Sequence, residues 1–412
     1  MQHVEALRVF LAGRQVGRLS IASRGQIYFQ YDNSWLDSGF DLSPGTLPFE
    51  ALPTVGPPEP FSGLHGALND SLPDGWGLLL MDRAMQSRFG WSREDITPLD
   101  RLAYIGDRGM GALEYQPELE SAAPEHAIDI AELAAASQAV LSGQAHKIVA
   151  DLYIQGGSPG GARPKITVAW NPKTNACLSG FSRLPAGFEH WMVKFRGVPE
   201  SRDAGRIEMA YAQMAADAGL CVPEARLMEV KVGKSKEAFF AVRRFDRSGD
   251  EKNHVLSLSG YLGADHRLPS LDYQHILAAT QRLTRDVSEV ARAFRLMVFN
   301  VLTHNKDDHA KNFAFIGTPA GWSLSPAYDL TYSAGMGDEH TSSVGGKGNP
   351  GLADVLPLAG NFLIKNAANV VDEVRAAVAK WPKIASKWQV SVKAIQAIGS
   401  RLKVIDKGFQ RN

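Results

Sequence analysis

The chain has 412 residues, more than one hydrophobic core usually organises, so two or three domains or lobes are expected. Hydrophobic residues make up 44% and charged residues 21% of the sequence, a globular balance that excludes wholesale disorder. The 44 Lys and Arg residues equal the 44 Asp and Glu residues, so no global positive field draws the chain to nucleic acid or to an anionic membrane.

Cysteine content and hydropathy indicate the compartment. Cys177 and Cys221 are too few for a disulfide framework or a cysteine metal site, which fits a reducing compartment. The N-terminus lacks a basic segment followed by an apolar one, and apolar runs such as 296–302 fall short of the roughly 18 residues of a membrane span. We expect a cytoplasmic protein that does not contact a membrane.

Apolar residues alternate with polar ones in three short N-terminal stretches, which predicts a small antiparallel sheet. The expected strands are 7–11, 16–21 and 27–31. Asp74, which follows a Gly- and Pro-rich stretch, is the expected cap of a helix over 78–89. A further helix is expected over 128–141, ending at Gly143.

From Lys165 the pattern changes to strands around one helix, which predicts a second sheet. The expected strands are 166–170, 191–195, 226–232 and 238–245. The helix is expected from about Ile207 to Ala218, before Gly219. Beyond residue 247 helices dominate, and a short strand pair interrupts them at 313–316 and 322–324. The expected helices are 273–283, 287–302, 367–380 and 392–402.

A dense polar segment, 304–312, lies between a predicted long helix and a predicted strand. Within it, Asp307 and Asn312 are spaced as D-x-x-x-x-N, the arrangement of protein-kinase catalytic loops. In those loops the Asp takes up the substrate hydroxyl proton and the Asn binds a metal ion. A solvated loop in which Asp307 or Asp308 caps a turn stays the alternative.

A second aspartate, Asp329, follows the predicted strand pair. In kinases an Asp at this place chelates the metal that bridges the nucleotide phosphates. Magnesium prefers hard oxygen ligands and keeps several waters, so one carboxylate, one amide oxygen and the phosphates form a sufficient shell. A turn aspartate after Pro326 is the alternative.

Lys194 lies inside an apolar predicted strand, where an unpaired ammonium would be costly to bury. Glu208 is expected to open the next helix and to reach back to Lys194, like the Lys–Glu pair of kinases. A solvent-facing lysine and a first-turn acid that complements the helix dipole are the alternatives. The order of these features along the chain favours the kinase interpretation.

A glycine-rich segment, 155–165, precedes the second sheet. Its four glycines free the backbone to approach an anion, and Lys165 can add a positive charge. The segment matches neither G-x-x-x-x-G-K-[ST] nor G-x-G-x-x-G, so a flexible loop between lobes is the alternative.

Several runs together resemble the HipA-type serine/threonine kinases, the toxin components of type II toxin–antitoxin pairs. These runs are Ser158–Lys165, Lys194, Val242–Arg247, Asp307–Phe313 and Ser325–Asp329. The N-terminal part is similar to that family's N-terminal domain, especially at Leu72–Trp76, so the resemblance spans nearly the whole chain.

The resemblance implies a role for each matching residue. Asp307 would be the catalytic base, Asn312 and Asp329 the magnesium ligands, and Lys194 a contact of the ATP phosphates. Ser158 occupies the family's autophosphorylation position in a phosphate loop. The other positions implied in ATP binding are Gly160, Gly161, Lys165, Glu208, Arg243, Phe245, His309 and Lys311.

Two positions depart from the family pattern. Relatives commonly carry an acid at the adenine-binding hinge position Arg243, so either its side chain or only its backbone would meet the nucleotide. Asp308 adds a carboxylate beside Asp307 where relatives often have a small or apolar residue, so the metal geometry or the substrate could differ.

The resemblance implies an α+β, two-lobed protein-kinase-like fold with a small N-terminal β-rich subdomain and a helical C-terminal lobe. We divide the chain into an N-terminal subdomain (1–125), a strand-rich nucleotide-binding lobe with the Gly-rich loop (126–247) and a helical lobe with the catalytic loop (248–412). The implied function is ATP- and Mg²⁺-dependent phosphorylation of a cellular protein, such as a tRNA-charging enzyme, that arrests growth. The implied partner is a helix-turn-helix antitoxin, through which alone the chain would meet DNA.

Two other classes of function remain open. A kinase-fold corepressor with weak catalysis would act mainly by binding the antitoxin, although the intact set of kinase residues argues against that loss. A metal-dependent hydrolase would use four ligands from one loop, namely His304, Asp307, Asp308 and His309.

Overall fold

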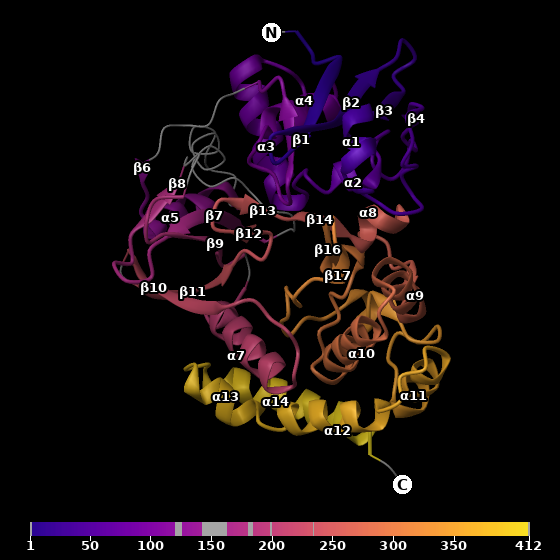
Figure 1. Ribbon diagram of the computed structural model, residues 1–412. Helices are drawn as coiled ribbons and strands as arrows, with labels where there is room; N and C mark the ends of the chain where they lie inside the picture. The colour runs from indigo at the N-terminus through magenta and orange to yellow at the C-terminus, as the bar shows by residue number, and fades with distance from the viewer. Residues whose placement is uncertain are drawn as a thin grey trace.

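The computed structural model describes residues 2–119, 126–141, 163–179, 184–197, 200–233 and 235–410. The N-terminal sheet and its helices form one end of the molecule, and helices near the C-terminus cross the opposite end (Figure 1). The second sheet and the rest of the C-terminal lobe lie between these ends (Figure 1). In the described part of the chain, no helix is both long and apolar enough to cross a membrane.

The N-terminal sheet is antiparallel and has the strand order β4-β3-β2-β1-β5. Its strands are β1 (Ala6–Leu11), β2 (Arg14–Ile21), β3 (Ile27–Tyr31), β4 (Thr54–Val55) and β5 (Leu113–Gln116). The accompanying helices are α1 (Asn33–Ser38), α2 (Gly66–Asn69), α3 (Gly75–Phe89) and α4 (Pro98–Ile105). Leu7 and Val9 are buried while Arg8 is exposed, so one face of β1 packs inward. The three predicted strands and the α3 helix are confirmed.

The second sheet has the order β10-β11-β9-β7-β8-β6. Its strands are β6 (His126–Ala127), β7 (Lys165–Trp170), β8 (Cys177–Ser179), β9 (Glu189–Lys194), β10 (Ala225–Val232) and β11 (Ser235–Arg243). Helix α5 (Ile130–Leu141) contacts β10, and α7 (Ala204–Asp217) contacts β10 and β11. The predicted helix end at Gly143 lies outside the described residues.

Helix α7 begins earlier than its apolar pattern predicts. It starts at Ala204 rather than near Ile207, so Glu208 lies in the second turn and the prediction that it opens the helix is wrong. The first turn, Ala204–Arg206, carries small and polar residues because it lies close to the backbone of β11, and it therefore shows no apolar periodicity.

The C-terminal lobe combines helices with a three-stranded sheet of order β14-β16-β17. These strands are β14 (His254–Ser257), β16 (Ala314–Thr318) and β17 (Gly321–Leu324). Two short pairs join β12 (Arg247–Ser248) to β13 (Glu251–Lys252) and β15 (Leu271–Asp272) to β18 (Ser342–Ser343). The helices are α8 (Leu258–Leu262), α9 (Tyr273–Thr284), α10 (Val287–Leu302), η1 (Ala310–Asn312), η2 (Met336–Asp338), α11 (Leu352–Asn361), α12 (Ala367–Val378), α13 (Trp381–Lys387) and α14 (Val392–Lys407).

A buried charge cluster fastens the N-terminal domain to the second sheet. Asp246 is 1% exposed and accepts hydrogen bonds from Arg244, Arg247 and the Gly111 backbone N–H. Arg247 also donates to the carbonyl oxygens of Gly109 and Gly111, at 2.9 and 2.7 Å. A buried carboxylate between two guanidinium groups needs this full set of partners, so these residues have a docking role.

Candidate active site

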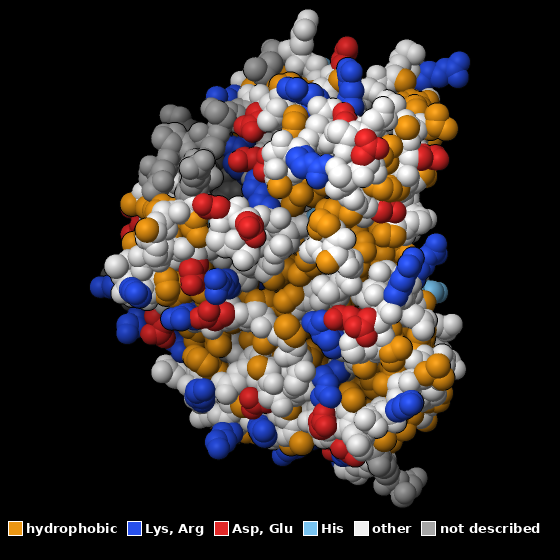
Figure 2. All heavy atoms as spheres, viewed as in Figure 1, with side chains coloured by type: hydrophobic (Ala, Val, Ile, Leu, Met, Phe, Trp, Pro, Cys, Tyr) orange, Lys and Arg blue, Asp and Glu red, His pale blue; other side chains and the backbone are white. Residues whose placement is uncertain are grey.

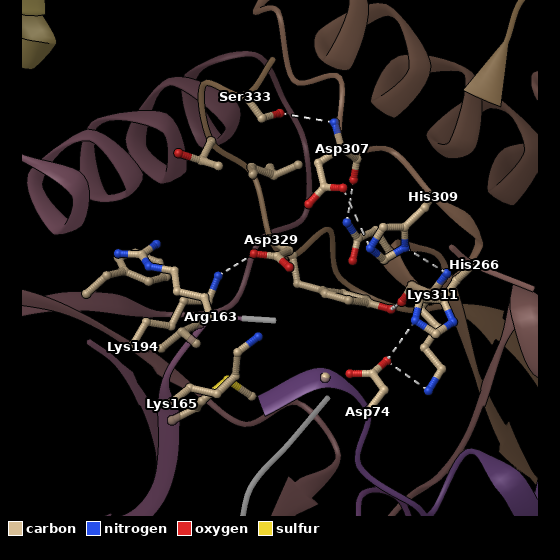
Figure 3. Close-up of a pocket in the computed structure, with 18 of the residues that line it drawn as sticks. Asp74, Arg163, Lys165, Lys194, His266, Asp307, His309, Lys311, Asp329 and Ser333 are labelled. Carbon is tan, nitrogen blue, oxygen red and sulfur yellow. Dashed lines mark hydrogen bonds and ion pairs between the residues drawn. The ribbon is translucent and has the colours of Figure 1, made fainter. Parts of the chain in front are cut away.

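A cleft of about 1330 Å³ opens between the second sheet and the C-terminal lobe. Helix α10, with ten of its sixteen residues buried, leads directly into the polar segment that forms one wall of this cleft. Figure 3 shows side chains from β7, β9, this segment and the N-terminal domain pointing toward one another. The cleft thus gathers residues that lie far apart in the sequence. From the predicted set, it is lined by Lys165, Lys194, Arg243, Phe245, Asp307, His309, Lys311, Asn312 and Asp329.

Two buried lysines lie side by side on neighbouring strands. Lys165 begins β7 and pairs directly with Lys194 at the end of β9, and they are 5% and 4% exposed. Like charges directly opposite each other destabilise a sheet unless an anion offsets them. The Lys165 amine forms no ion pair with any residue that the structure describes. This arrangement is therefore a ready site for an anion such as phosphate.

Lys194 connects the sheet to α7 and to the C-terminal lobe. Its Nζ lies 2.8 Å from Glu208 Oε2 and also pairs with Asp329 Oδ1. Burial lowers the pKa of Lys194 to about 8, because the nearby Asp329 carboxylate only partly offsets the effects of burial and of Lys165 and Arg163. The expected Lys194–Glu208 pair is present, and Glu208 is 1% exposed behind the cleft wall.

Arg163 joins this cluster and was missed by the sequence analysis. Its guanidinium pairs with Glu208 and lies 3.0 Å from Glu200, and its Nε donates to the Phe195 carbonyl at 3.0 Å. Burial lowers its pKa, although the carboxylates of Glu200 and Asp329 oppose this. The only available signal was its place two residues before Lys165 in the Gly-rich run.

The polar segment presents Asp307 to the cleft. Its side chain lines the cleft and is 60% exposed. Desolvation within the cleft, together with Asp329 and Asp308, raises the pKa of Asp307 against the opposing effect of His309. The Asp307 N–H donates to Ser333 Oγ at 3.0 Å (Figure 3). A base in this place has both a fixed backbone and an accessible carboxylate.

Asn312 and Asp329 supply the hard oxygen atoms of the cleft. Asn312 Nδ2 donates to the Asp307 carbonyl at 2.6 Å, which leaves its Oδ1 available. Although burial alone would raise it, the pKa of Asp329 is held well below its ordinary value by Lys194 and Lys165. Asp329 also adopts a left-handed backbone, with φ of 56°. A carboxylate kept ionised beside an amide oxygen fits a magnesium ion.

Asp308 does not extend this site. It is 1% exposed, and its carboxylate accepts from Tyr273 at 2.8 Å and lies 2.8 Å from His340 Nδ1. The Ser342 backbone N–H also donates to it, at 3.2 Å. The idea that Asp308 changes the metal geometry is therefore not supported, because this carboxylate is enclosed in the helical lobe.

The four-ligand metal site of the hydrolase hypothesis is also not assembled. His304 stacks on Tyr332 and its Nδ1 lies 3.0 Å from the Ser333 carbonyl, while Asp308 points into the lobe. Among the described residues, no group of three or more His, Cys, Asp or Glu side chains could hold a metal ion. Asn312 of this segment, together with Asp329 beyond β17, offers oxygen atoms that fit a metal ion instead.

Arg243 and Phe245 lie at the sheet end of the cleft. The Arg243 guanidinium is 3.9 Å from Glu189 and 4.0 Å from Glu224, and its backbone N–H donates to the Glu224 carbonyl. Phe245 packs against Tyr328, with ring centroids 5.4 Å apart. Arg243 is thus held by two acids at the rim, and Phe245 helps form an apolar wall. Other apolar lining residues include Met192, Val222, Pro223, Val242, Ala327 and Leu330.

The N-terminal domain contributes a carboxylate that sequence reasoning treated as a helix cap. Asp74 stands at the N-cap of α3, but its side chain makes no capping hydrogen bond. It lies 3.0 Å from Lys311 Nζ and 3.4 Å from His266 Nε2 (Figure 3). Burial and Lys311 together lower the pKa of His266 to about 4, so this imidazole is neutral near pH 7. Ser158, Gly160 and Gly161 lie outside the described residues.

Family comparisons cover most of this architecture. The model of the HipA-like C-terminal domain matches residues 157–381, and that of the HipA N-terminal domain matches residues 7–116. The chain belongs to the HipA family. These matches include both the cleft and the N-terminal domain that supplies Asp74.

Individual HipA relatives are distant in sequence. HipA of Shewanella oneidensis, named as a serine/threonine-protein kinase toxin, is 24% identical over 414 residues, covering 91% of this chain and 88% of that protein. Y4dM of Sinorhizobium fredii, named as a candidate kinase, is 31% identical over 159 residues. That match covers 34% of this chain and 36% of Y4dM, so the chain matches about a third of that relative.

The solved structure of Shewanella oneidensis HipA with HipB and operator DNA shares the fold. The TM-score is 0.69 at 18% identity, and the match covers 97% of this chain and 95% of that one. The fold is α+β and two-lobed, of the protein-kinase-like type, as predicted, with a small β-rich N-terminal part and a helical C-terminal lobe.

Proposed function

We propose that the chain is an ATP- and Mg²⁺-dependent protein serine/threonine kinase and the toxin of a toxin–antitoxin pair. The observation that carries this proposal is the buried Lys165–Lys194 pair, which faces Asp329, Asn312 and Asp307 across one cleft. Two adjacent ammonium groups favour a polyphosphate, and the oxygen ligands opposite them favour its magnesium ion. The chain's membership of the HipA family supports the same assignment.

In the proposed mechanism, Lys165 and Lys194 hold the phosphates while Glu208 fixes the direction of Lys194. Asn312 and Asp329 would hold magnesium, which when bound offsets the charge of the transferring phosphoryl group. Asp307 accepts the proton of the attacking serine or threonine hydroxyl, for which its carboxylate must be ionised.

The adenine would enter the apolar end of the cleft near Phe245. The backbone N–H groups of Arg243 and Arg244 are already donated, to Glu224 and His190. In the described part of the chain, the Phe245 N–H has no hydrogen-bond acceptor, so it is the next hinge donor for a purine nitrogen. The adenine would thus be bound by the backbone N–H of Phe245 and not by the side chain of Arg243.

The proposed partner is a helix-turn-helix antitoxin, by analogy with the HipA–HipB–operator complex of Shewanella oneidensis. On the face shown in Figure 2, Lys and Arg side chains alternate with Asp and Glu around a central apolar region. Together with the zero net charge, this mixture favours DNA contact through the partner. The proposal also includes cytoplasmic action on a cellular protein such as a tRNA-charging enzyme, and autophosphorylation at Ser158.

We also propose the division into an N-terminal subdomain (1–125), a nucleotide-binding lobe (126–247) and a helical lobe (248–412). The Asp246 cluster lies at the second of these boundaries, and the first falls just before β6.

The decisive test of the proposed function is Asp307→Asn, which keeps the size of the side chain and removes the base. Phosphate transfer from γ-labelled ATP to the chain itself and to dephosphorylated casein should fall about 10²–10⁴-fold. The melting temperature should stay unchanged, because the carboxylate makes no buried contact. Asp372→Asn, on α12, is the matched control and should keep full activity. Transfer at the wild-type rate in Asp307→Asn would end the kinase assignment.

A further inference from the structure

The stretch from Ser333 to Ser342, here called the 333–342 segment, follows Asp329 and runs beside the loop that carries Asp307. At its start, the Ser333 N–H donates to the His304 carbonyl at 3.1 Å, and Ser333 Oγ accepts from the Asp307 N–H (Figure 3). At its end, the Thr341 N–H and hydroxyl both donate to the Lys306 carbonyl, at 3.1 and 2.9 Å. The segment therefore bonds the backbone that leads into Asp307, including the N–H of Asp307 itself.

One carboxylate, Asp338, holds the middle of this segment. Its Oδ1 lies 3.0 Å from Lys306 Nζ and 3.3 Å from His304 Nε2, and its Oδ2 lies 3.3 Å from Arg401 of α14. Lys306 immediately precedes Asp307 in the sequence and is 3% exposed. Its Nζ also donates to the Asp338 carbonyl and, at 2.7 Å, to Asn349 Oδ1. Two cations and a histidine from two elements thus converge on one anion.

The backbone of the segment is shaped for this contact. Gly337 and Asp338 both have left-handed conformations, with φ of 65° and 58°. Aspartate and asparagine tolerate this region better than other side chains. A side chain at Gly335 would overlap the Glu339 carbonyl and lie 3.1 Å from the Lys306 Cβ, so the turn packs directly on Lys306.

Many protein kinases order the equivalent segment only after phosphorylation, when the new phosphate pairs with basic side chains. We propose that Asp338 is a positioning residue that replaces such a phosphate, so that the 333–342 segment and the Asp307 loop are ordered without modification. This inference rests on the proposed function. It assigns to Lys306, which precedes Asp307, the role of the basic side chain that pairs with the phosphate in other kinases.

An ion pair that only stabilised the fold would affect stability rather than kcat alone. Asp338 is 50% exposed, and exposed ion pairs contribute little to global stability. Its effect on Asp307 passes through named contacts, namely Lys306, Thr341 and Ser333, and none of these holds the nucleotide. Loss of the Asp338 charge should therefore lower kcat while the affinity for Mg-ATP stays constant.

The test variant is Asp338→Asn, which keeps the size and the tolerance for the left-handed backbone and removes only the charge. With γ-labelled ATP and dephosphorylated casein, kcat should fall about 10-fold, equivalent to about 1.4 kcal/mol. Binding of Mg-ATP, measured by calorimetry, should change less than about twofold. Asp338→Glu should recover part of kcat. The matched control, Asp406→Asn, breaks the 2.7 Å Arg375–Asp406 pair between α12 and α14 and should leave kcat unchanged.

Wild-type protein treated with a protein phosphatase, and shown by peptide mass spectrometry to carry no phosphate in 333–342, should retain its kcat. An unchanged kcat in Asp338→Asn would overturn the inference, as would loss of wild-type activity when phosphate is removed from this segment. A parallel loss of kcat, Mg-ATP binding and melting temperature would also overturn it in favour of a structural role. A wild-type chain without any transfer activity would instead refute the proposed function itself.

Discussion

At the residue scale, Lys194 has two acidic partners with different expected tasks. Glu208 is buried and stays with α7, whereas Asp329 faces the cleft and is 30% exposed. A bound metal ion would draw Asp329 away from Lys194 and free the ammonium for a phosphate. Under the proposed function, the charges of Lys194 and Asp329 would separate when metal and nucleotide bind together.

Measurements of nucleotide affinity should distinguish the proposed metal ligands, Asn312 and Asp329, from Lys194, the proposed direct contact of the phosphates. Asn312→Ala and Asp329→Ala should weaken binding of a non-hydrolysable ATP analogue about 10-fold in magnesium, because these oxygens meet the phosphates through the metal. In EDTA, Asp329→Ala should bind as well as wild type or better, since a negative charge that faces the phosphates is gone. Lys194→Ala should weaken binding in both conditions.

Calorimetry with and without EDTA measures this contrast. Asn366→Ala is a suitable control, because Asn366 is exposed at the start of α12 and makes no side-chain capping bond. Equal losses for all three cleft variants in both conditions would contradict the assignment of metal ligands.

The sequence could predict those site residues whose partners lie at a regular spacing. Asp307 and Asn312 share one loop, and Lys194 interrupts an apolar strand, so local pattern was sufficient. Arg163, Asp74 and His266 were missed because their roles depend on contacts across the fold, such as the pairing of Asp74 with Lys311. Asp338 was missed as well, although the basic residue directly before Asp307 was a usable signal.

At the element scale, α7 is the helix that links Lys194 of the cleft to the rest of the molecule. Glu208 on one side of it holds Lys194, and Tyr211 donates to the Thr303 carbonyl at the end of α10. Arg206 reaches the Trp388 carbonyl beyond α13 at 3.2 Å, and Gln213 accepts from Trp388 Nε1 at 2.9 Å. The C-terminal helices thus brace α7 against the sheet, as their arrangement in Figure 1 shows.

Gly205→Ala tests whether the position of α7 against β11 determines how well the cleft binds ATP. A Cβ at Gly205 would overlap the Ala238 carbonyl and lie 3.0 Å from the Phe240 backbone nitrogen, and backbone atoms of β11 cannot move aside. We expect a loss of about 1–3 kcal/mol in the free energy of unfolding and several-fold weaker ATP binding, because Glu208 shifts with the helix.

Gly360→Ala provides a matched control for this change. Gly360 lies in α11, and a Cβ there has no neighbour within 4 Å, so alanine should stabilise the helix by up to about 1 kcal/mol. Urea unfolding and ATP titration of both variants make the comparison. Unimpaired ATP binding by a destabilised Gly205→Ala protein would show that α7 does not transmit its position to Lys194.

Elements with a regular local pattern were predicted well, including the short strands of the N-terminal sheet, whereas elements that depend on a distant partner were not. The predicted helix over 287–302 matches α10 because its buried face repeats at helical spacing. Strand β14 has only four residues, and it is a strand because it pairs with β16, which lies about sixty residues further along the chain. No local pattern could reveal that pairing.

At the scale of the whole molecule, the N-terminal domain and the C-terminal lobe share one buried interface. His254 of β14 is 2% exposed, and its Nε2 lies 2.9 Å from the Leu42 carbonyl of the N-terminal domain. Its ring packs between Phe40 and Trp322, at centroid distances of 5.9 and 5.7 Å. Burial of His254 and its packing between these two rings therefore contribute to the strength of the interface.

This interface should weaken in mild acid. Burial lowers the pKa of His254 from 6.5 to about 4, although the hydrogen bond to Leu42 opposes the shift. Between these values the unfolded chain binds a proton that the folded chain does not, so the free energy of unfolding falls as the pH falls. For this residue alone, the loss between pH 7 and pH 5 is about 2 kcal/mol.

His254→Gln isolates that contribution, because glutamine can still donate to the Leu42 carbonyl but does not titrate. Urea unfolding, followed by tryptophan fluorescence at both pH values, should show a smaller loss of stability in the variant than in the wild type. The difference between the two losses should be about 2 kcal/mol, since every other titrating group is shared by both proteins. Identical losses in the two proteins would mean that His254 does not stay neutral in the folded state. The N-terminal domain would then be held mainly by the Asp246 cluster. The Asp246 carboxylate remains ionised at pH 5, because Arg244 and Arg247 outweigh the effect of burial and hold the pKa of Asp246 far below its ordinary value.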